Sequence, residues 1–249
     1  LPQGGGAMRS IGETFKTNPV TGTASATIPL PMTAAPRGPT PELSLSYDSG
    51  SGNGLFGHGW SLGVPQIARR TDQKLPEYTD SEDSDEFLFG GESLVPLYEN
   101  DGAIRHGTVS GDYLIERYRP RAQGAFTIVE RWTHTTNRTV HWRAHAADNT
   151  VSLFGLSDDS RIAAPGLPKR VYAWLIDESR DDRGHVVVYG YASENRVDVP
   201  LGKAHEASRR TGLAPISNKH LKRVRWGNTR MDAELARVLP VATTVRDSC

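Results

Sequence analysis

Apolar and polar residues alternate along much of the chain with the two-residue period of half-buried β-strands. Positions of one parity carry the apolar residues, while the intervening positions carry serine, glutamate, threonine or arginine. Such alternation is typical of sheets that present one face to a core and the other to water. The segments with this pattern are 24–30, 43–47, 126–132 and 140–142.

Short unbroken apolar runs predict further strands that are buried on both faces. These runs are Phe87–Phe89, Val151–Phe154, 171–176 and 186–189. Residues that favour turns separate them at intervals of about 8–15 positions, as in sheets built from hairpins. The turn signals stand at 100–102, 110–112, 148–149 and 182–184.

Helical signals are scarce and fall in two places. Residues 230–239 have Thr229 as a possible N-cap and Pro240 as a stop, and residues 203–210 could form a second short helix. The fold class predicted is therefore all-β, with antiparallel sheets of short strands, Gly/Pro-rich turns and at most one or two short helices. We expect one β domain over residues 1–228 and a divergent tail over 229–249.

Composition narrows the classes of function. The 249 residues contain 29 Lys plus Arg and 29 Asp plus Glu, so the formal charge is zero. Nucleic-acid and anionic-membrane proteins usually carry a basic excess, and we therefore expect neither partner. Cys249 is the single cysteine and permits no intrachain disulfide.

The sequence also bears on localisation. No apolar run approaches the roughly 20 residues of a membrane helix, and the first residues lack the pattern of a Sec signal. We expect a protein that is made in the cytoplasm, does not insert into a membrane and leaves the cell by another route.

One glycine-rich stretch matches two enzyme motifs. The segment 52–57 has the glycine spacing of a dinucleotide-binding loop, but two more glycines and Pro65 follow where a helix is required. The segment 59–63 places Ser61 as in the nucleophile elbow of hydrolases, again without the strand before it and the helix after it. Both matches are better explained as glycine-rich turns around a buried Trp60.

The sequence supports a metal or ion site no better than it supports the two enzyme motifs. His141 and His145 would lie about 13 Å apart on a strand, too far to share a metal, and His134 completes no ligand set. The acidic stretch 80–86 has Asp85 where a calcium loop needs glycine, so we expect an exposed loop. No catalytic, cofactor-binding or metal-binding residue is predicted, and no cofactor.

Several separate blocks of sequence resemble a known family, the SpvB-type N-terminal domain. That domain opens the B components of bacterial insecticidal toxin complexes and a Salmonella virulence plasmid protein, and is loosely shared with Rhs/YD-repeat proteins. The blocks follow in order over roughly residues 1–228. They are 1–13, 18–23, 43–49, 52–54, 56–57, 59–62, 69–72, 85–87, 94–96, 117–121, 130–132, 141–142, 174–178, 221–223 and 227–228.

The resemblance implies a non-catalytic structural module. In the toxin complexes, the B component and an Rhs-repeat C component form a hollow β-shell around a toxic segment of C, and B docks on a pore-forming A component. The expected partners are the rest of a B component and a C component, with A reached indirectly, and the expected location is extracellular. The ADP-ribosyltransferase activity of the Salmonella protein is not implied, because its Glu-x-Glu motif is missing here.

The sequence is also compatible with two other functions. Five tryptophans and eight tyrosines would suit an adhesive or carbohydrate-binding domain, and Ser61 is the one sharp candidate for a hydrolase. We expect the aromatic residues to be core anchors and the glycines of the motif stretch to hold backbone that a β-carbon would strain. The anchors are Tyr47, Trp60, Trp132, Trp142 and Trp174, and the glycines are Gly52, Gly54, Gly57 and Gly59.

Overall fold

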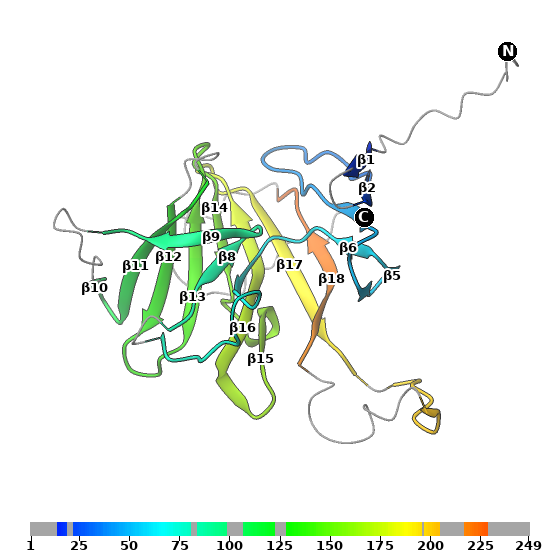
Figure 1. Ribbon diagram of the computed structural model, residues 1–249. Helices are drawn as coiled ribbons and strands as arrows, with labels where there is room; N and C mark the ends of the chain where they lie inside the picture. The colour runs from blue at the N-terminus through cyan, green and yellow to red at the C-terminus, as the bar shows by residue number, and fades with distance from the viewer. Residues whose placement is uncertain are drawn as a thin grey trace, which may run out of the picture. The chain divides into compact units, whose positions relative to one another are not determined.

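The computed structural model describes residues 14–18, 22–80, 84–98, 107–122, 128–195, 197–204 and 217–228, and these segments are built from β-strands and one 3-10 turn, η2 (Figure 1). The all-β, antiparallel fold class is confirmed. The bounds are β1 Thr14–Asn18, β2 Thr23–Pro29, β3 Ser44–Asp48, β4 Asn53–Gly54, β5 Gly57–His58, β6 Trp60–Leu62, β7 Gln66–Arg69, β8 Phe87–Phe89, β9 Glu92–Pro96, β10 Thr108–Ser110, β11 Tyr113–Pro120, β12 Ile128–His134, β13 Val140–His145, β14 Val151–Phe154, η2 Asp158–Ser160, β15 Arg161–Ala164, β16 Leu167–Arg180, β17 Val186–Ser193 and β18 Lys219–Arg225.

Two compact units make up the chain. The first takes Leu1–Ala34 and Thr40–Val64, and the second takes Ala35–Pro39 and Pro65–Cys249. The described part of the first unit is an antiparallel sheet of order β1-β2-β3-β6, with the small hairpin β4–β5 inserted between β3 and β6. Within this described part, the large apolar side chain of Leu43 is buried.

The second unit contains a closed barrel. Strands pair in the order β14-β13-β12-β11-β9-β8-β7-β16, and β16 pairs in turn with β14, which closes the ring. Closure depends on the 14-residue length of β16, because its residues 173–175 pair with β7 and its residues 176–180 pair with β14. Strand β16 also pairs with β15 and with β17, and β18 extends the sheet by pairing with β17.

Large aromatic side chains fill the barrel. Trp142 and Trp174 are 0% and 1% exposed, and the ring of Phe87 lies 4.9 Å and 5.9 Å from theirs. The Trp174 indole N–H donates to the Val140 carbonyl at 3.0 Å, so its polar atom is satisfied inside the core. Barrels of this size have an interior that side chains just fill.

A glycine makes this packing possible at the end of β14. Gly155 has φ +68°, and a β-carbon there would lie 2.2 Å from Cδ1 of Trp174. Only glycine fits both the backbone conformation and the space beside the indole.

Most predicted strands are confirmed, but only some of the predicted aromatic anchors lie in the core. The segments 24–30, 43–47, 87–89, 140–142, 151–154, 171–176 and 186–189 form strands wholly or largely, and three of the four turn signals join hairpins. The turn 100–102, Phe126 and the helix 230–239 lie outside the described residues, as does most of 203–210, and the 1–228 boundary stays a prediction. Trp142 and Trp174 are core anchors, whereas Tyr47, Trp60 and Trp132 are only half-buried, so that part of the expectation was wrong.

We predict that Trp142→Ala lowers the free energy of unfolding by about 3–5 kcal/mol, because a fully buried ring leaves a cavity in the barrel. Trp60→Ala removes a half-buried ring that packs on Tyr47 at 5.2 Å and should cost less than that range. Urea unfolding of both variants, followed by circular dichroism, makes the comparison. Equal losses for the two substitutions would contradict the assignment of the core.

Candidate functional site

The motif-bearing stretch forms a hairpin and an edge strand, not a catalytic turn. Gly54 and Gly57 pair across β4–β5, and Ser61 is the middle residue of β6, opposite Ser46 of β3. Its hydroxyl donates to the Ser46 carbonyl at 3.5 Å. No helix follows either motif in the described residues, so the geometry of a nucleotide-binding loop or a nucleophile elbow is not formed there.

The glycines of this stretch have unequal roles. Gly59 has φ +78°, and a β-carbon would lie 2.7 Å from both the Asp48 carbonyl oxygen and the Tyr47 ring. A β-carbon at Gly54 would lie 2.4 Å from the Trp60 carbonyl oxygen, while Gly57 needs its φ of +101°. Gly52 has open space and an ordinary φ, so the expected strain is wrong at that position.

We predict that Gly59→Ala destabilises the first unit by at least about 1–3 kcal/mol, the usual cost of a strained residue with φ above zero. Gly52→Ala is the matched control in the same hairpin and should leave stability nearly unchanged. The difference is measured by hydrogen exchange of the β3 amides. Identical exchange in the two variants would show that the hairpin does not need a glycine at position 59.

The histidines lie on the outer face of β12 and β13 and face aromatic and charged neighbours. His141 stacks on Trp132 at 5.7 Å, and its burial, with Arg143 nearby, lowers its pKa to about 3. His145 lies 3.4 Å from Glu130, and this contact is the main cause that lowers the pKa of Glu130 to about 2. The described residues contain no group of three potential metal ligands.

Among the described residues, the Trp132 ring on the outer face of the barrel is covered and does not form an open aromatic platform. The Arg143 guanidinium carbon lies 3.6 Å from the centre of the Trp132 ring, and His141 stacks on the same residue. Trp142 and Trp174 are in the interior. The tryptophans on which the carbohydrate-binding alternative rested are therefore covered or buried at these positions.

The acidic stretch contains a buried carboxylate, which corrects the expectation of an exposed loop. The Asp85 side chain is 2% exposed and accepts a hydrogen bond from Arg69 Nη1 at 2.7 Å. Asp80 accepts from the same guanidinium at 2.6 Å and 3.0 Å, and Arg69 Nε donates to the Val171 carbonyl at 2.7 Å. Arg69 thereby ties the loop between β7 and β8 to the strand that closes the barrel.

The same carboxylate organises the loop around it. The backbone N–H groups of Glu77 and Tyr78 donate to Asp85 at 2.9 Å each. Burial alone would raise the pKa of Asp85, but these two amides and the Arg69 guanidinium outweigh it and hold the pKa below its usual range. Asp85 is therefore a structural anion at neutral pH.

We predict that Asp85→Asn costs about 3 kcal/mol at neutral pH, the low end for breaking a buried ion pair, since Asp80 still pairs with Arg69. Because the folded pKa is depressed, the stabilisation is present above the ordinary aspartate pKa of about 4 and is lost as the pH falls further. Urea unfolding at pH about 7 and about 3 should show the difference from wild type shrinking at the lower pH. Asp72→Asn, at an exposed partner of Arg70, is the control and should change little at either pH.

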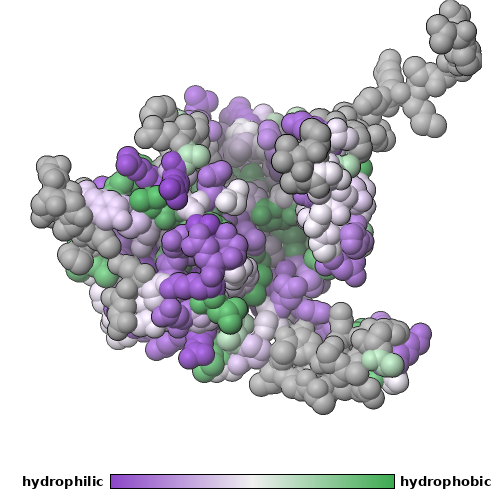
Figure 2. Space-filling model, viewed as in Figure 1, coloured by the Kyte–Doolittle hydropathy of each residue, from purple (hydrophilic) through white to green (hydrophobic). Residues whose placement is uncertain are grey.

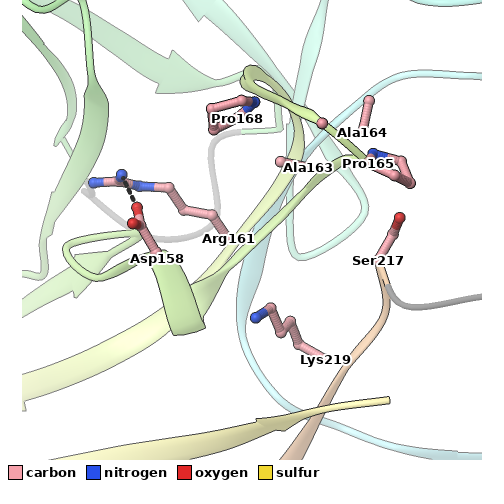
Figure 3. Close-up of a pocket in the computed structure, with 9 residues that line it drawn as sticks. Asp158, Arg161, Ala163, Ala164, Pro165, Pro168, Ser217 and Lys219 are labelled. Carbon is pink, nitrogen blue, oxygen red and sulfur yellow. Dashed lines mark hydrogen bonds and ion pairs between the residues drawn. The ribbon is translucent and has the colours of Figure 1, made fainter. Parts of the chain in front are cut away.

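A surface cleft of about 350 Å³ lies between the β15–β16 hairpin and the start of β18 (Figure 3). Alanines and prolines line one side, and Ser217 and Lys219 line the other. The cations here are already used: Arg161 donates to Asp158 and to two carbonyls, and Lys219 donates to Ser193 Oγ at 2.7 Å. The cleft thus presents neither a free anion-binding group nor a catalytic pair.

A second groove, about 230 Å³, runs along β17 and β18. Its lining is Val188, Gly190, Tyr191, Lys222, Arg223 and Arg225. No helix among the described residues has the length and apolarity to cross a membrane.

Comparison with known proteins gives consistent matches. The family model "Salmonella virulence plasmid 65kDa B protein" matches residues 18–245. The mono(ADP-ribosyl)transferases SpvB of Salmonella typhimurium strain 14028s and Salmonella dublin are 34% identical over 244 residues. The matches cover 94% of this chain but only 39% and 38% of those proteins.

Solved structures match over similar lengths. The N-terminal domain of the effector SpvB from Salmonella typhimurium strain LT2 matches with a TM-score of 0.71 at 34% identity, covering 85% of this chain and 67% of that one. A crystal structure of TcdB2-TccC3 matches with a TM-score of 0.74 at 31% identity, covering 97% of this chain and 12% of that one. A Photorhabdus luminescens Tc holotoxin pore matches with a TM-score of 0.73 at 33% identity, covering 92% and 10%.

Proposed function

Because the chain belongs to the family of the Salmonella virulence plasmid 65kDa B protein, we propose that it is a non-catalytic structural module of a toxin-complex B component. In that role it contributes to the wall of a β-shell that encloses and delivers a toxic partner segment. Its partners are the rest of the B component and an Rhs-repeat C component, with the pore-forming A component reached indirectly. The assembly acts outside the producing cell.

The proposal rests on the structural match, which covers a large share of this chain but a small share of the known chain. Nearly the whole chain, 97%, superposes on 12% of a TcdB2-TccC3 chain. A fold that forms a small part of so long a chain functions together with its surroundings. The curated relatives named as ADP-ribosyltransferases are matched over 39% of their length or less, and we propose that their chemistry lies in the remainder.

The physical character of the barrel supports a role as a wall. Buried aromatic rings and paired arginines fill its interior, so the described residues offer outer surfaces and strand edges to partners. Hydrophilic and hydrophobic residues are mixed over the face seen in Figure 2. A filled barrel is stiff, because close-packed interiors resist compression, and stiffness suits a container wall.

We predict that the chain co-elutes with the remaining part of a B component and a cognate C component in size-exclusion chromatography with light scattering. The physical reason is that the module completes its sheets and surfaces against those partners. Ser61→Ala should assemble equally well and leave every activity of the complex unchanged.

Two outcomes would oppose the proposal. A well-folded monomer that ignores both partners would remove the role in the shell. Loss of an activity in Ser61→Ala with assembly intact would point instead to a hydrolase.

A further inference from the structure

The last strand of the barrel sheet has an unusual concentration of one charge. Strand β18 reads Lys-His-Leu-Lys-Arg-Val-Arg, with four formal cations and no acid, whereas the whole chain has 29 basic and 29 acidic residues. Figure 1 shows β17 and β18, in yellow and orange, running side by side as a ribbon away from the barrel. Within the described residues, β18 ends the strand order and pairs only with β17.

The free edge of β18 carries backbone groups that can pair. The Glu194 N–H donates to the Asn218 carbonyl at 3.0 Å, which fixes the alternation of the ladder just beyond the strand. By that alternation the His220 amide points to β17, while the Leu221 amide points to the open edge. The Lys219 amide also points away from β17, and it donates to Asn218 Oδ1 at 3.2 Å. An extended segment could add to this edge by ordinary strand pairing.

The charges beside this edge are not used within the described structure. Lys222 and Arg223 are exposed and make no hydrogen bond or ion pair among the residues described, and they line the groove with Arg225. A register shift between Gly190 and Tyr191 leaves Lys222 without a Cα partner on β17, and such a bulge redirects the side chains beside it. The two free cations therefore stand together next to the open edge.

From this combination we propose that β18 is the docking edge for an extended acidic segment of a partner polypeptide. The inference rests on the proposed function and names the edge and the partner chemistry. The segment adds as a further strand, and its Asp or Glu side chains pair with Lys222 and Arg223 from the adjacent strand position, roughly 4.8 Å away.

Charge decides between this occupant and two others. A second copy would bring another basic β18 to the edge, and like charges across neighbouring strands repel, so lysines here oppose self-association. A nucleic acid would require a broad basic surface, whereas the whole chain has a formal charge of zero. An acidic strand satisfies both the open Leu221 amide and the free cations.

The test uses the chain reconstituted with the remaining part of a B component and a C component. The double variant Lys222→Glu/Arg223→Glu should weaken the affinity at least tenfold and reverse the effect of added salt, because attraction becomes repulsion. The matched control is Lys169→Glu/Arg170→Glu, which makes the same change of charge at exposed positions of β16 and should keep wild-type affinity. Hydrogen exchange should show the amide of Leu221 protected at least tenfold in the wild-type complex relative to the free chain.

The outcomes separate this inference from the proposed function. If the wild-type chain fails to assemble at all, the structural-module proposal fails. If it assembles but the β18 variant binds as tightly as the control, or the Leu221 amide stays unprotected, the docking edge is refuted. A 20-base-pair duplex DNA that binds the wild-type chain as tightly as the protein partners do would also refute it, in favour of a site for polyanions.

Discussion

The barrel depends on the hydrogen bonds and ion pairs that the buried Arg69 guanidinium makes. It comes from β7, bonds to the Val171 carbonyl on β16 and holds Asp80 and Asp85 of the loop that leads to β8. Its carbon also lies 5.2 Å and 5.4 Å from the ring centres of Phe87 and Trp174. One side chain thus joins the closing strand, the loop and the aromatic core.

This arrangement explains how charged residues can occupy a filled barrel. Arg131 is paired in a similar way, because its Nη2 lies 2.7 Å from Glu116 Oε2 and its guanidinium carbon lies 5.5 Å from the centre of the Phe87 ring. Removing two charges from water is expensive, and neither pair adds much net stability over an apolar core. Their contribution is specificity, because the four hydrogen bonds of Arg69 form together only with the loop in one position and β7 in one register.

The sequence predicts the strands better than it predicts their closure. Period-two alternation and short apolar runs identify β2, β3, β8, β13, β14 and β17, because these patterns follow directly from which faces are buried. The pairing of β14 with β16 joins residues 151–154 to residues 176–180, and no local pattern encodes such a contact. The division into two units is likewise a property of contacts and not of composition.

The errors at individual residues have the same origin. Asp85 belongs to a run of acids that is typical of solvated loops, and its burial depends on Arg69, sixteen positions earlier. The blocks 69–72 and 85–87, both part of the family resemblance, were the available signal. Trp60 was expected in the core because tryptophan usually is, but the described sheet of the first unit offers its ring only Tyr47 as an aromatic partner. Gly155 ends an apolar run, and nothing local shows that Trp174 lies beside it.

We propose that a filled barrel serves a toxin assembly through its surfaces and edges. An electron cryo-microscopy map of the chain assembled with the rest of a B component and a C component tests it most directly. We expect an intact barrel whose sheet continues from its outer edge into strands of the neighbouring polypeptide, as part of one wall. A barrel that stands apart from the shell, joined to it only by a tether, would contradict this role.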